Sequence, residues 1–190
     1  MGQAEFEAKL AERGAVLRGH FQYASGRHGE IYVEKFRILR WPDITGELCG
    51  EIAAHFRGQP NLVAGPTTGG ILLSYETARH LGLRSIIAER KDEGEGREFK
   101  RGFEIGAGDR VLVVDDVLTT GGSIRDVIDA VRRRGADVIG AAVLFDRGLW
   151  RANLDMPLFA VERLSAPSYA AEDCPLCAER VPLDNPKGVR

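Results

Sequence analysis

Short apolar runs rich in β-branched residues recur along the chain, and helical patterns separate several of them. The runs are NLVAG (61–65), SIIAE (85–89), RVLVV (110–114), VIGAAVLFD (138–146) and LFAVE (158–162). Helices are predicted over 42–58, 69–82 and 123–136, the last with its apolar residues at the spacing of one helical face. This alternation predicts an α/β fold with an open, mainly parallel sheet flanked by helices.

Length and charge limit the classes of protein that fit. The 190 residues are most simply one domain, 1–190, with an N-terminal region at about 14–40, a core sheet over 61–162 and a Pro- and Cys-containing tail over 163–190. A net charge of -2 gives no general attraction to nucleic acid or acidic membranes, and no apolar stretch is long enough to span a bilayer. Three cysteines, an odd number, argue against a secreted disulfide scaffold. We expect a cytoplasmic protein without a nucleic-acid or membrane partner.

One apolar run continues into VVDDVLTTGGS, which contains two acids, two threonines and two glycines. Ligands of open α/β sheets bind at the carboxyl ends of the strands, and the N–H groups at the start of a following helix attract phosphate. Ser123 is the predicted N-cap of that helix. Asp115 and Asp116 would repel a phosphate unless they face sugar hydroxyls or a hydrated Mg²⁺. The pattern favours a phosphorylated sugar as ligand, and the alternative is a tight turn with two solvated acids.

The segment VLVVDDVLTTGGS resembles the motif of type I phosphoribosyltransferases that binds 5-phosphoribosyl 1-pyrophosphate (PRPP), whereas neither a P-loop nor a G-x-G-x-x-G pattern is present. The resemblance implies that Asp115 and Asp116 bind the ribose hydroxyls. The residues around the 5′-phosphate would then be Val117, Leu118, Thr119, Thr120, Gly121, Gly122 and Ser123. LVAGPTTGGILLS resembles the loop that handles pyrophosphate, through Thr67, Thr68 and Gly69, although an ordinary glycine turn is the alternative.

Two further segments resemble orotate phosphoribosyltransferases. FQYASGRHGEIYVEK is similar to the hood SGR-x-S-x-x-Y that lies over the pyrimidine in that family, with a plain surface hairpin as the alternative. AVLFDRG is similar to a segment of that family in which an Arg follows an apolar strand and an Asp. The guanidinium of this Arg is a natural partner for the orotate carboxylate. The implied orotate-binding residues are Thr119, Arg147, Ser25, Gly26, Arg27 and Tyr32.

The segment ERKDEGEGREFKR (89–101) has ten charged residues among thirteen, which by composition alone favours a solvated hairpin tip. Its position matches the mobile catalytic loop of the family, which reaches the active site of the partner subunit in a homodimer. There Arg90 and Lys91 would meet the pyrophosphate and act, with Asp115 and Asp116, as the catalytic residues. The segment is too polar and glycine-containing to be expected in a core, so we expect it to be mobile when the site is empty.

The chain also departs from the family pattern. Ala24 stands where family members commonly have a lysine before SGR, and Gly69 stands where they often have one in the pyrophosphate turn. The charged segment is shorter than the usual loop and lacks its further lysine and its histidine. The cations could instead come from elsewhere, with three candidates: Lys35, Arg97 and Lys100.

The tail contains CPLC, with Cys174 and Cys177 in a C-x-x-C arrangement. One such pair supplies two zinc ligands, whereas a structural zinc site has four. The histidines, at positions 20, 28, 55 and 80, are all distant in sequence from this pair. The pair is therefore either a turn without metal or half of a zinc site shared between two chains. Cys49, within the predicted helix 42–58, is expected in the core.

Taken together, the resemblance implies transfer of a phosphoribosyl group from PRPP to orotate, giving orotidine 5′-phosphate and pyrophosphate in pyrimidine biosynthesis, with Mg²⁺ bound mainly through PRPP and water. A purine-base phosphoribosyltransferase is an alternative that SGRH and FDRG disfavour. A PRPP-sensing regulator without catalysis is another. The missing loop lysine and histidine favour it, and the absence of a basic N-terminal DNA-binding domain disfavours it.

Overall fold

The computed structural model describes residues 3–23, 25–146, 154–163 and 167–184. The chain forms two compact units, of which one comprises Met1–Ile38 with Ser165–Arg190 and the other Leu39–Leu164. None of the helices in these described ranges has the length and apolar character that a bilayer crossing requires.

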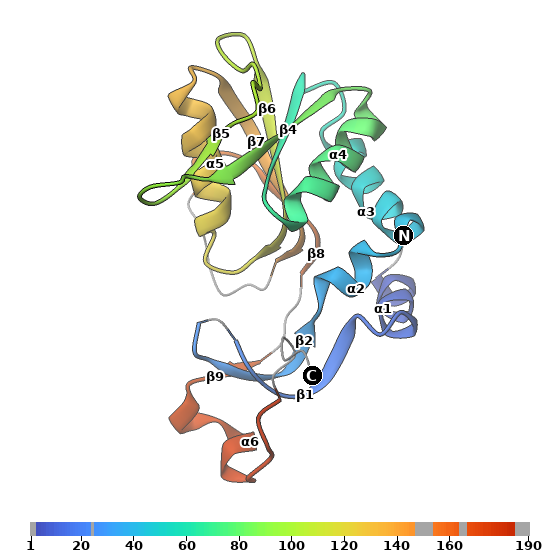
Figure 1. Cartoon of the computed structure of the whole chain (residues 1–190). Helices are drawn as coiled ribbons and strands as arrows, with labels where there is room; N and C mark the ends of the chain where they lie inside the picture. The colour runs from blue at the N-terminus through green and yellow to red at the C-terminus, as the bar shows by residue number, and fades with distance from the viewer. Residues whose placement is uncertain (1–2, 24, 147–153, 164–166, 185–190) are drawn as a thin grey trace. The chain divides into compact units, whose positions relative to one another are not determined.

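The second unit contains a six-stranded sheet in the order β5-β4-β3-β6-β7-β8 (Figure 1). Its strands are β3 (Leu62–Pro66), β4 (Arg84–Arg90), β5 (Arg97–Phe99), β6 (Arg110–Leu118), β7 (Asp137–Asp146) and β8 (Leu158–Arg163). All neighbours pair in parallel except β5, which runs antiparallel to β4 at the edge. The five apolar runs are the five parallel strands, so the predicted α/β fold with an open, mainly parallel sheet is confirmed.

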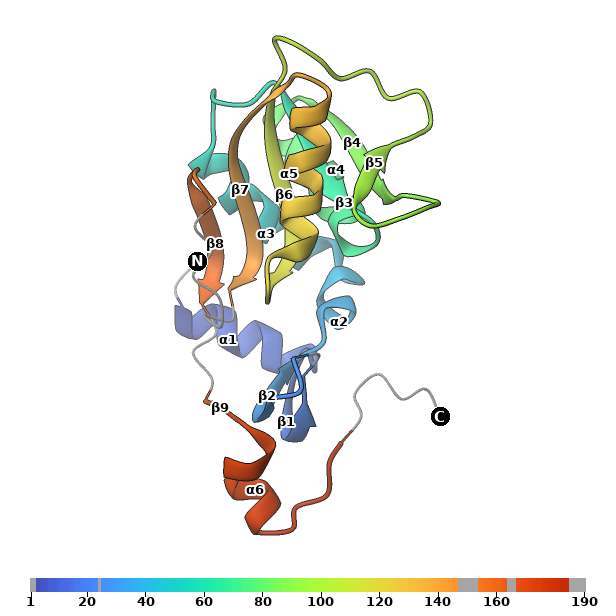
Figure 2. The same ribbon diagram turned by 90° about the vertical axis from the view of Figure 1, so that its left-hand side faces the viewer.

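Helices cover both faces of this sheet (Figure 2). α5 (Gly122–Arg133) lies on one face, and α3 (Pro42–His55) and α4 (Gly69–Leu81) lie on the other. α5 buries the apolar face expected from its spacing, which consists of Ile124, Val127, Ile128 and Val131 together with Ala130. Because β6 is covered on both sides, its residues from Val111 to Val114 are all fully buried, as a continuous apolar run requires.

The first unit joins the two ends of the chain. It contains α1 (Gln3–Glu12), β1 (Val16–Gln22), β2 (His28–Val33), α2 (Lys35–Leu39), β9 (Ser168–Tyr169), the 3₁₀ turn η1 (Ala171–Asp173) and α6 (Pro175–Ala178). β1 and β2 form an antiparallel hairpin, and β9 pairs with β2 as a third strand, with His28 opposite Tyr169. A further bridge joins Phe21 to Asp184. The tail is therefore part of the same small sheet as the N-terminal hairpin.

Candidate active site

The two acids were expected at the carboxyl end of the strand that contains the apolar run 110–114, but β6 continues past them to Leu118. β6 pairs with β7 as far as Leu118, so Asp115 to Leu118 are strand residues. Asp115 and Asp116 are 6% and 5% exposed. One oxygen of each is held by the backbone, since Asp116 N donates to Asp115 Oδ1 (2.8 Å) and Val117 N donates to Asp116 Oδ1 (2.7 Å). The pair is thus a fixed, buried arrangement of carboxylates.

The turn after β6 leads directly into the N-terminus of α5. The N-cap is Gly121, in the left-handed region at φ 74, and it has no side-chain hydrogen bond to the helix. The prediction that Ser123 is the N-cap is therefore wrong, because a glycine takes the backbone conformation that this turn requires. A helix whose first N–H groups are not capped by the N-cap side chain provides donors for an anion.

The turn between β3 and α4 lies against the acid pair. A Cβ added to Gly69 would stand 2.0 Å from Asp116 Oδ2, and one added to Gly65 would stand 2.2 Å from the Gly70 carbonyl oxygen. The residues predicted to handle pyrophosphate, Thr67 to Gly69, therefore adjoin the residues predicted to bind PRPP. They do so because β3 and β6 are parallel neighbours and their carboxyl ends meet at one edge of the sheet.

Arg97 on β5 links these two turns. Its side chain donates to Thr67 Oγ1 (2.9 Å), the Thr67 carbonyl oxygen (3.1 Å) and Ser123 Oγ (3.3 Å), as well as to the Ala88 carbonyl oxygen (3.0 Å). The residue is 5% exposed. Burial lowers the pKa of the guanidinium and the Asp115 carboxylate raises it, but an arginine stays charged at neutral pH. A positive charge is thus held beside both turns.

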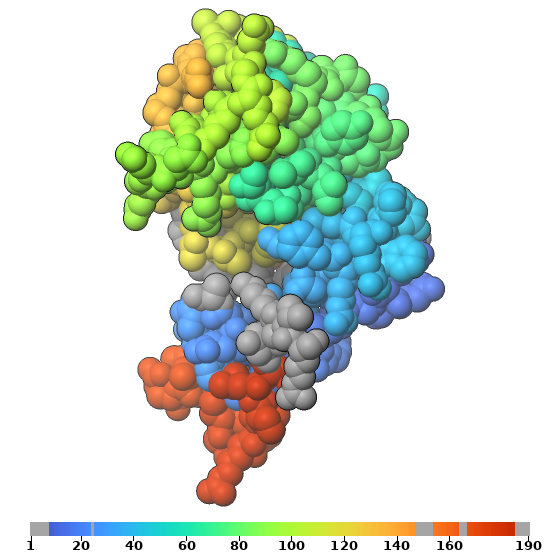
Figure 3. All heavy atoms as spheres, viewed as in Figure 1, coloured from blue at the N-terminus to red at the C-terminus, as the bar shows by residue number. Residues whose placement is uncertain are grey.

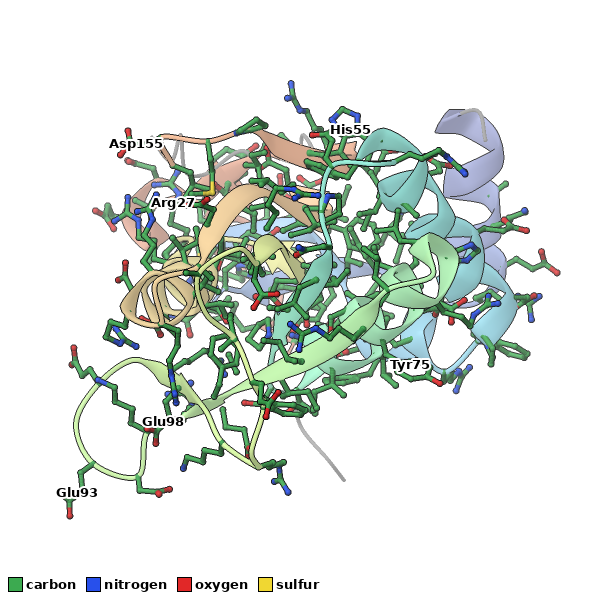
Figure 4. All side chains as sticks on the ribbon, turned by 90° about the horizontal axis from the view of Figure 1, so that it is seen from above. Arg27, His55, Tyr75, Glu93, Glu98 and Asp155 are labelled. Atoms are coloured by element: carbon green, nitrogen blue, oxygen red, sulfur yellow. The ribbon has the colours of Figure 1, made fainter. Side chains whose placement is uncertain are left out.

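The charged segment forms a hairpin of β4 and β5, whose tip projects from the surface of the second unit (Figure 3). Glu93 points away from the sheet at this tip (Figure 4). Two ion-pair groups hold the hairpin: Lys100 with Asp92 (2.5 Å) and Glu98 (3.5 Å), and Arg101 with Glu89 (2.7 Å).

The expectation that no part of this segment would pack in a core is wrong. Phe99 is 5% exposed and belongs to the hydrophobic core under α5. Arg133 and Arg134, at the end of α5, donate to the carbonyl oxygens of Arg97 and Phe99. Arg90 and Lys91 lie where β4 enters the tip, and neither makes an ion pair within the described part of the chain.

The residues predicted to bind orotate lie in different parts of the chain. Ser25, Gly26 and Arg27 form the β1–β2 turn, and Tyr32 lies on β2, with its ring 5.6 Å from that of Phe21. Arg27 donates through Nε to Ser168 Oγ (3.0 Å) and through Nη2 to the Ser168 carbonyl oxygen, so β9 orients it. Thr119 belongs to the turn before α5. Arg147 lies outside the described residues.

A cluster that the sequence reasoning missed lies in the first unit. His20 and His28 lie with Cys174 and Cys177, and one ligand atom of each lies within 4.8 Å of the others. The signal that could have found the histidines is their position on either side of the SGR turn, in a segment for which a surface hairpin was the alternative interpretation. Cys49, in contrast, is fully buried, and burial raises the pKa of its thiol to about 12, as expected of a core residue.

Known proteins resemble the chain over most of its length. The family model "Phosphoribosyl transferase domain" matches residues 37–167. The chain is 45% identical over 187 residues to the orotate phosphoribosyltransferase of Pelotomaculum thermopropionicum, covering 98% of this chain and 97% of the relative. It is 42% identical to that of Chlorobaculum parvum, covering 98% and 96%.

Solved structures of phosphoribosyltransferases share the fold of this chain. A crystal structure of orotate phosphoribosyltransferase from Aeropyrum pernix matches with a TM-score of 0.72 and 32% identity, covering 83% of this chain and 92% of that one. An adenine phosphoribosyltransferase from Thermoanaerobacter pseudethanolicus shares the fold, with a TM-score of 0.65 at 18% identity.

Proposed function

Because the chain belongs to the phosphoribosyltransferase family and, within it, to the orotate phosphoribosyltransferases, we propose that the acid pair of β6 and the turn before α5 bind PRPP. The reaction transfers the phosphoribosyl group of PRPP to orotate and gives orotidine 5′-phosphate and pyrophosphate, a step of pyrimidine biosynthesis. The observation that carries the assignment of residues is the buried acid pair beside a helix N-terminus that the N-cap side chain leaves uncapped.

Each part of PRPP has a chemically suited partner in this arrangement. Asp115 and Asp116 accept hydrogen bonds from the ribose hydroxyls. Their carboxylates face away from the phosphate, whose negative charge would repel them. The 5′-phosphate binds the N–H groups at the start of α5 and the hydroxyls of the turn, from Val117 to Ser123. The pyrophosphate binds at Thr67, Thr68 and Gly69, beside the charge of Arg97.

The chemistry places modest demands on the side chains. The bond from ribose C1 to pyrophosphate breaks, positive charge develops on the sugar, and a ring nitrogen of orotate attacks. The protein accelerates this by positioning the two substrates and by stabilising the charge on the leaving group. Arg97 acts as a positioning residue, because its four hydrogen bonds fix the pyrophosphate turn and the side chain of Ser123 relative to each other.

Mg²⁺ fits the donor set of this site. The two buried carboxylates lie near the carboxyl end of β6, and their oxygens are the hard ligands that Mg²⁺ prefers, either directly or through its bound waters. Asp115 and Asp116 would hold the hydrated ion, chiefly through water and PRPP. When bound, the ion supplies positive charge to the departing pyrophosphate.

Base recognition is proposed for the residues that carry the resemblance. Arg147 and Thr119 bind the orotate carboxylate, and Ser25, Gly26, Arg27 and Tyr32 form the hood over the ring. Support from the structure is local: the β1–β2 turn is formed, and β9 holds Arg27 in place.

A homodimer with shared active sites is proposed as the working form. Arg90 and Lys91 stand at the base of a projecting tip and have no ion-pair partner among the described residues, so they are suited to reach a leaving group in the partner subunit. α4 presents Leu72 and Tyr75 on its exposed side, 48% and 66% exposed, and large apolar side chains exposed together are typical of protein interfaces. The cytoplasmic location expected from the odd number of cysteines stays a prediction.

The test is the loss of orotate absorbance in the presence of PRPP and Mg²⁺, with adenine, hypoxanthine and uracil as control bases. Turnover of orotate alone is expected. The purine-base alternative is not favoured, since the chain is 45% identical to the orotate phosphoribosyltransferase of Pelotomaculum thermopropionicum over 98% of its length. Tight PRPP binding without turnover of any base would instead favour the regulator.

A further inference from the structure

Four soft or borderline ligand atoms converge in the first unit, from segments far apart in the sequence. His20 lies on β1, and His28 is the first residue of β2. Cys174 is the N-cap of the short helix α6, and Cys177 lies within this helix. The segment with β9 and α6 lies beside the β1–β2 hairpin in both ribbon views (Figures 1 and 2). Any ligand that all four side chains share would therefore join the tail to the hairpin.

Four of the six distances between these atoms are close to the edges of a zinc tetrahedron, and all six lie within 4.8 Å. His20 Nε2 lies 3.1 Å from His28 Nδ1, 3.5 Å from Cys174 Sγ and 3.7 Å from Cys177 Sγ, and Cys177 Sγ lies 3.3 Å from His28 Nδ1. Usual zinc bond lengths give tetrahedral edges of about 3.3 Å between two nitrogens and about 3.6 Å between nitrogen and sulfur. The observed distances agree with these values to within a few tenths of an ångström.

Hydrogen bonds among the four side chains do not account for this convergence. A ring nitrogen of histidine has one position in the ring plane for a donor or acceptor, yet His20 Nε2 has three neighbours within 3.7 Å. His20, His28 and Cys174 are also buried, at 1%, 4% and 2% exposure. Buried polar atoms need a partner, and a single cation between them would satisfy all four.

The second nitrogen of His20 provides an independent observation. His20 Nδ1 lies 2.7 Å from the carbonyl oxygen of Val181. A carbonyl only accepts, so Nδ1 carries the proton and the lone pair of Nε2 faces the cluster. A histidine that binds a metal commonly donates its other N–H to a carbonyl in this way, which fixes both the tautomer and the ring orientation.

We propose that His20, His28, Cys174 and Cys177 of one chain bind a structural Zn²⁺. Two thiolates and two imidazoles at tetrahedral spacing are a ligand set typical of zinc, and with four protein ligands no coordination position remains for a water or a substrate. The ion therefore stabilises the fold and takes no part in phosphoribosyl transfer. The ion links Cys174 and Cys177 to the two strands of the hairpin. The tail is then held to the hairpin by the metal as well as by the short β2–β9 pairing.

The position of His28 gives the ion a second effect, which rests on the proposed function. His28 follows Arg27 directly and pairs with Tyr169 on β9. Tyr169 is next to Ser168, which orients Arg27. Zinc at His28 would hold the turn that contains the proposed hood residues. Loss of the ion should therefore weaken orotate binding more than PRPP binding, because the proposed PRPP residues lie in the other unit.

The first test is the metal content of the untagged protein, measured by mass spectrometry after dialysis. About one zinc per chain is expected. The double variant Cys174→Ser/Cys177→Ser and the variant His20→Gln should lose the ion, whereas the controls His80→Gln and Cys49→Ala should keep it. Co²⁺ in place of zinc should give the visible absorption of a tetrahedral site with thiolate ligands, which a site made by other residues would not show.

A metal content near zero, iron in place of zinc, or about half an ion per chain would overturn the proposal. The last result would indicate a site shared between two chains. A disulfide between Cys174 and Cys177 in freshly purified protein, seen as two unreactive thiols that a reductant releases, would overturn it as well.

A chelator experiment on the unmodified protein covers the case in which the variants do not fold. Removal of zinc is expected to lower the melting temperature and to raise the orotate KM at least about fivefold, while calorimetry shows PRPP affinity unchanged. An unchanged melting temperature after complete removal would contradict the structural role. If zinc is present but orotate is no substrate, the site stands and the proposed function fails; if zinc is absent and orotate reacts, the reverse holds.

Discussion

The carboxylate of Asp116 lies directly against the α-carbon of Gly69: a Cβ at position 69 would stand 2.0 Å from Oδ2 and 3.0 Å from Cγ. The carboxylate cannot simply rotate away, because its other oxygen accepts the N–H of Val117. This contact gives a physical reason for a glycine at a position where family members often have a lysine, since a side chain here would displace one of the two proposed ribose ligands.

The variant Gly69→Ala is therefore expected to weaken PRPP binding about tenfold, or about 1.4 kcal/mol, through displacement of Asp116. Calorimetric titration with PRPP measures this. Gly50→Ala on α3 is the matched control, since a Cβ there would meet only His80 at an ordinary 3.5 Å. Equal PRPP affinity in the two variants would show that the carboxylate moves without cost.

Replacing both acids, Asp115→Asn with Asp116→Asn, should abolish turnover and leave the fold intact. The amides retain the size of the carboxylates but lose the charge and the acceptor strength that the ribose hydroxyls and the hydrated cation require. PRPP affinity should fall at least about tenfold, roughly 1.4 kcal/mol. Asp129→Asn, at an exposed position of α5, serves as control. PRPP binding that survives the double change would remove the assignment of this pair.

Arg97→Lys tests the link between the two turns. A lysine keeps a positive charge but cannot make the four hydrogen bonds of the buried guanidinium, and each partner left unsatisfied costs about 1–3 kcal/mol. We expect a melting temperature several degrees lower and a raised KM for PRPP. Arg101→Lys changes an exposed arginine whose partner is Glu89, and should leave both quantities nearly unchanged. Identical behaviour of the two variants would argue against a linking role.

Arg147→Ala should raise the KM for orotate far more than the KM for PRPP, because a bidentate guanidinium–carboxylate pair recognises only the base. Steady-state kinetics with each substrate varied in turn separates the two constants. In the unmodified protein, uracil lacks the carboxylate and should react poorly. Uracil that reacts as well as orotate would contradict the assignment of this arginine.

The hairpin tip is predicted to act in the partner subunit. Lys91→Ala and the Asp115/Asp116 double variant are each expected to be inactive, and subunit exchange between them should restore activity, because one hybrid site then has an intact tip and an intact acid pair. Verified heterodimers that stay at background would mean that the tip serves its own chain. Full activity of Lys91→Ala alone would show that another cation meets the pyrophosphate.

The parts of the fold that could be predicted from the sequence are those that local burial determines. β3 and most of β6 and β7 are buried on both faces and are therefore continuous apolar runs. β4 and β8 are only partly buried but still contain short apolar stretches, and the spacing along α5 predicted its buried face. β5 was not recognisable, because an edge strand of three residues between charges has no such pattern. The N-cap was misplaced at Ser123 because residue type indicates a cap only where the backbone allows one, and here Gly121 takes that position.

The candidate site was predictable to the extent that it is local in sequence. The acids, the glycines and the turn before α5 follow one another along the chain, so the motif was visible at once. The role of Arg97 was only one of three possibilities, since its contacts with Thr67 and Ser123 depend on the pairing of β5 with β4. The four residues of the proposed zinc site were not brought together from the sequence, because Cys174 lies 154 positions after His20.

The first unit contains segments from both the N-terminal and the C-terminal part of the chain, and this arrangement determines the order in which the two units can fold during synthesis. β9 cannot pair with β2 until Tyr169 has left the ribosome, and every strand of the six-stranded sheet, which ends at Arg163, leaves before it. The larger unit can thus fold while the N-terminal hairpin still lacks its third strand. A protease that cuts just before Ser168 would leave the six-stranded sheet complete and the edge of β2 exposed, and such an edge invites pairing between molecules.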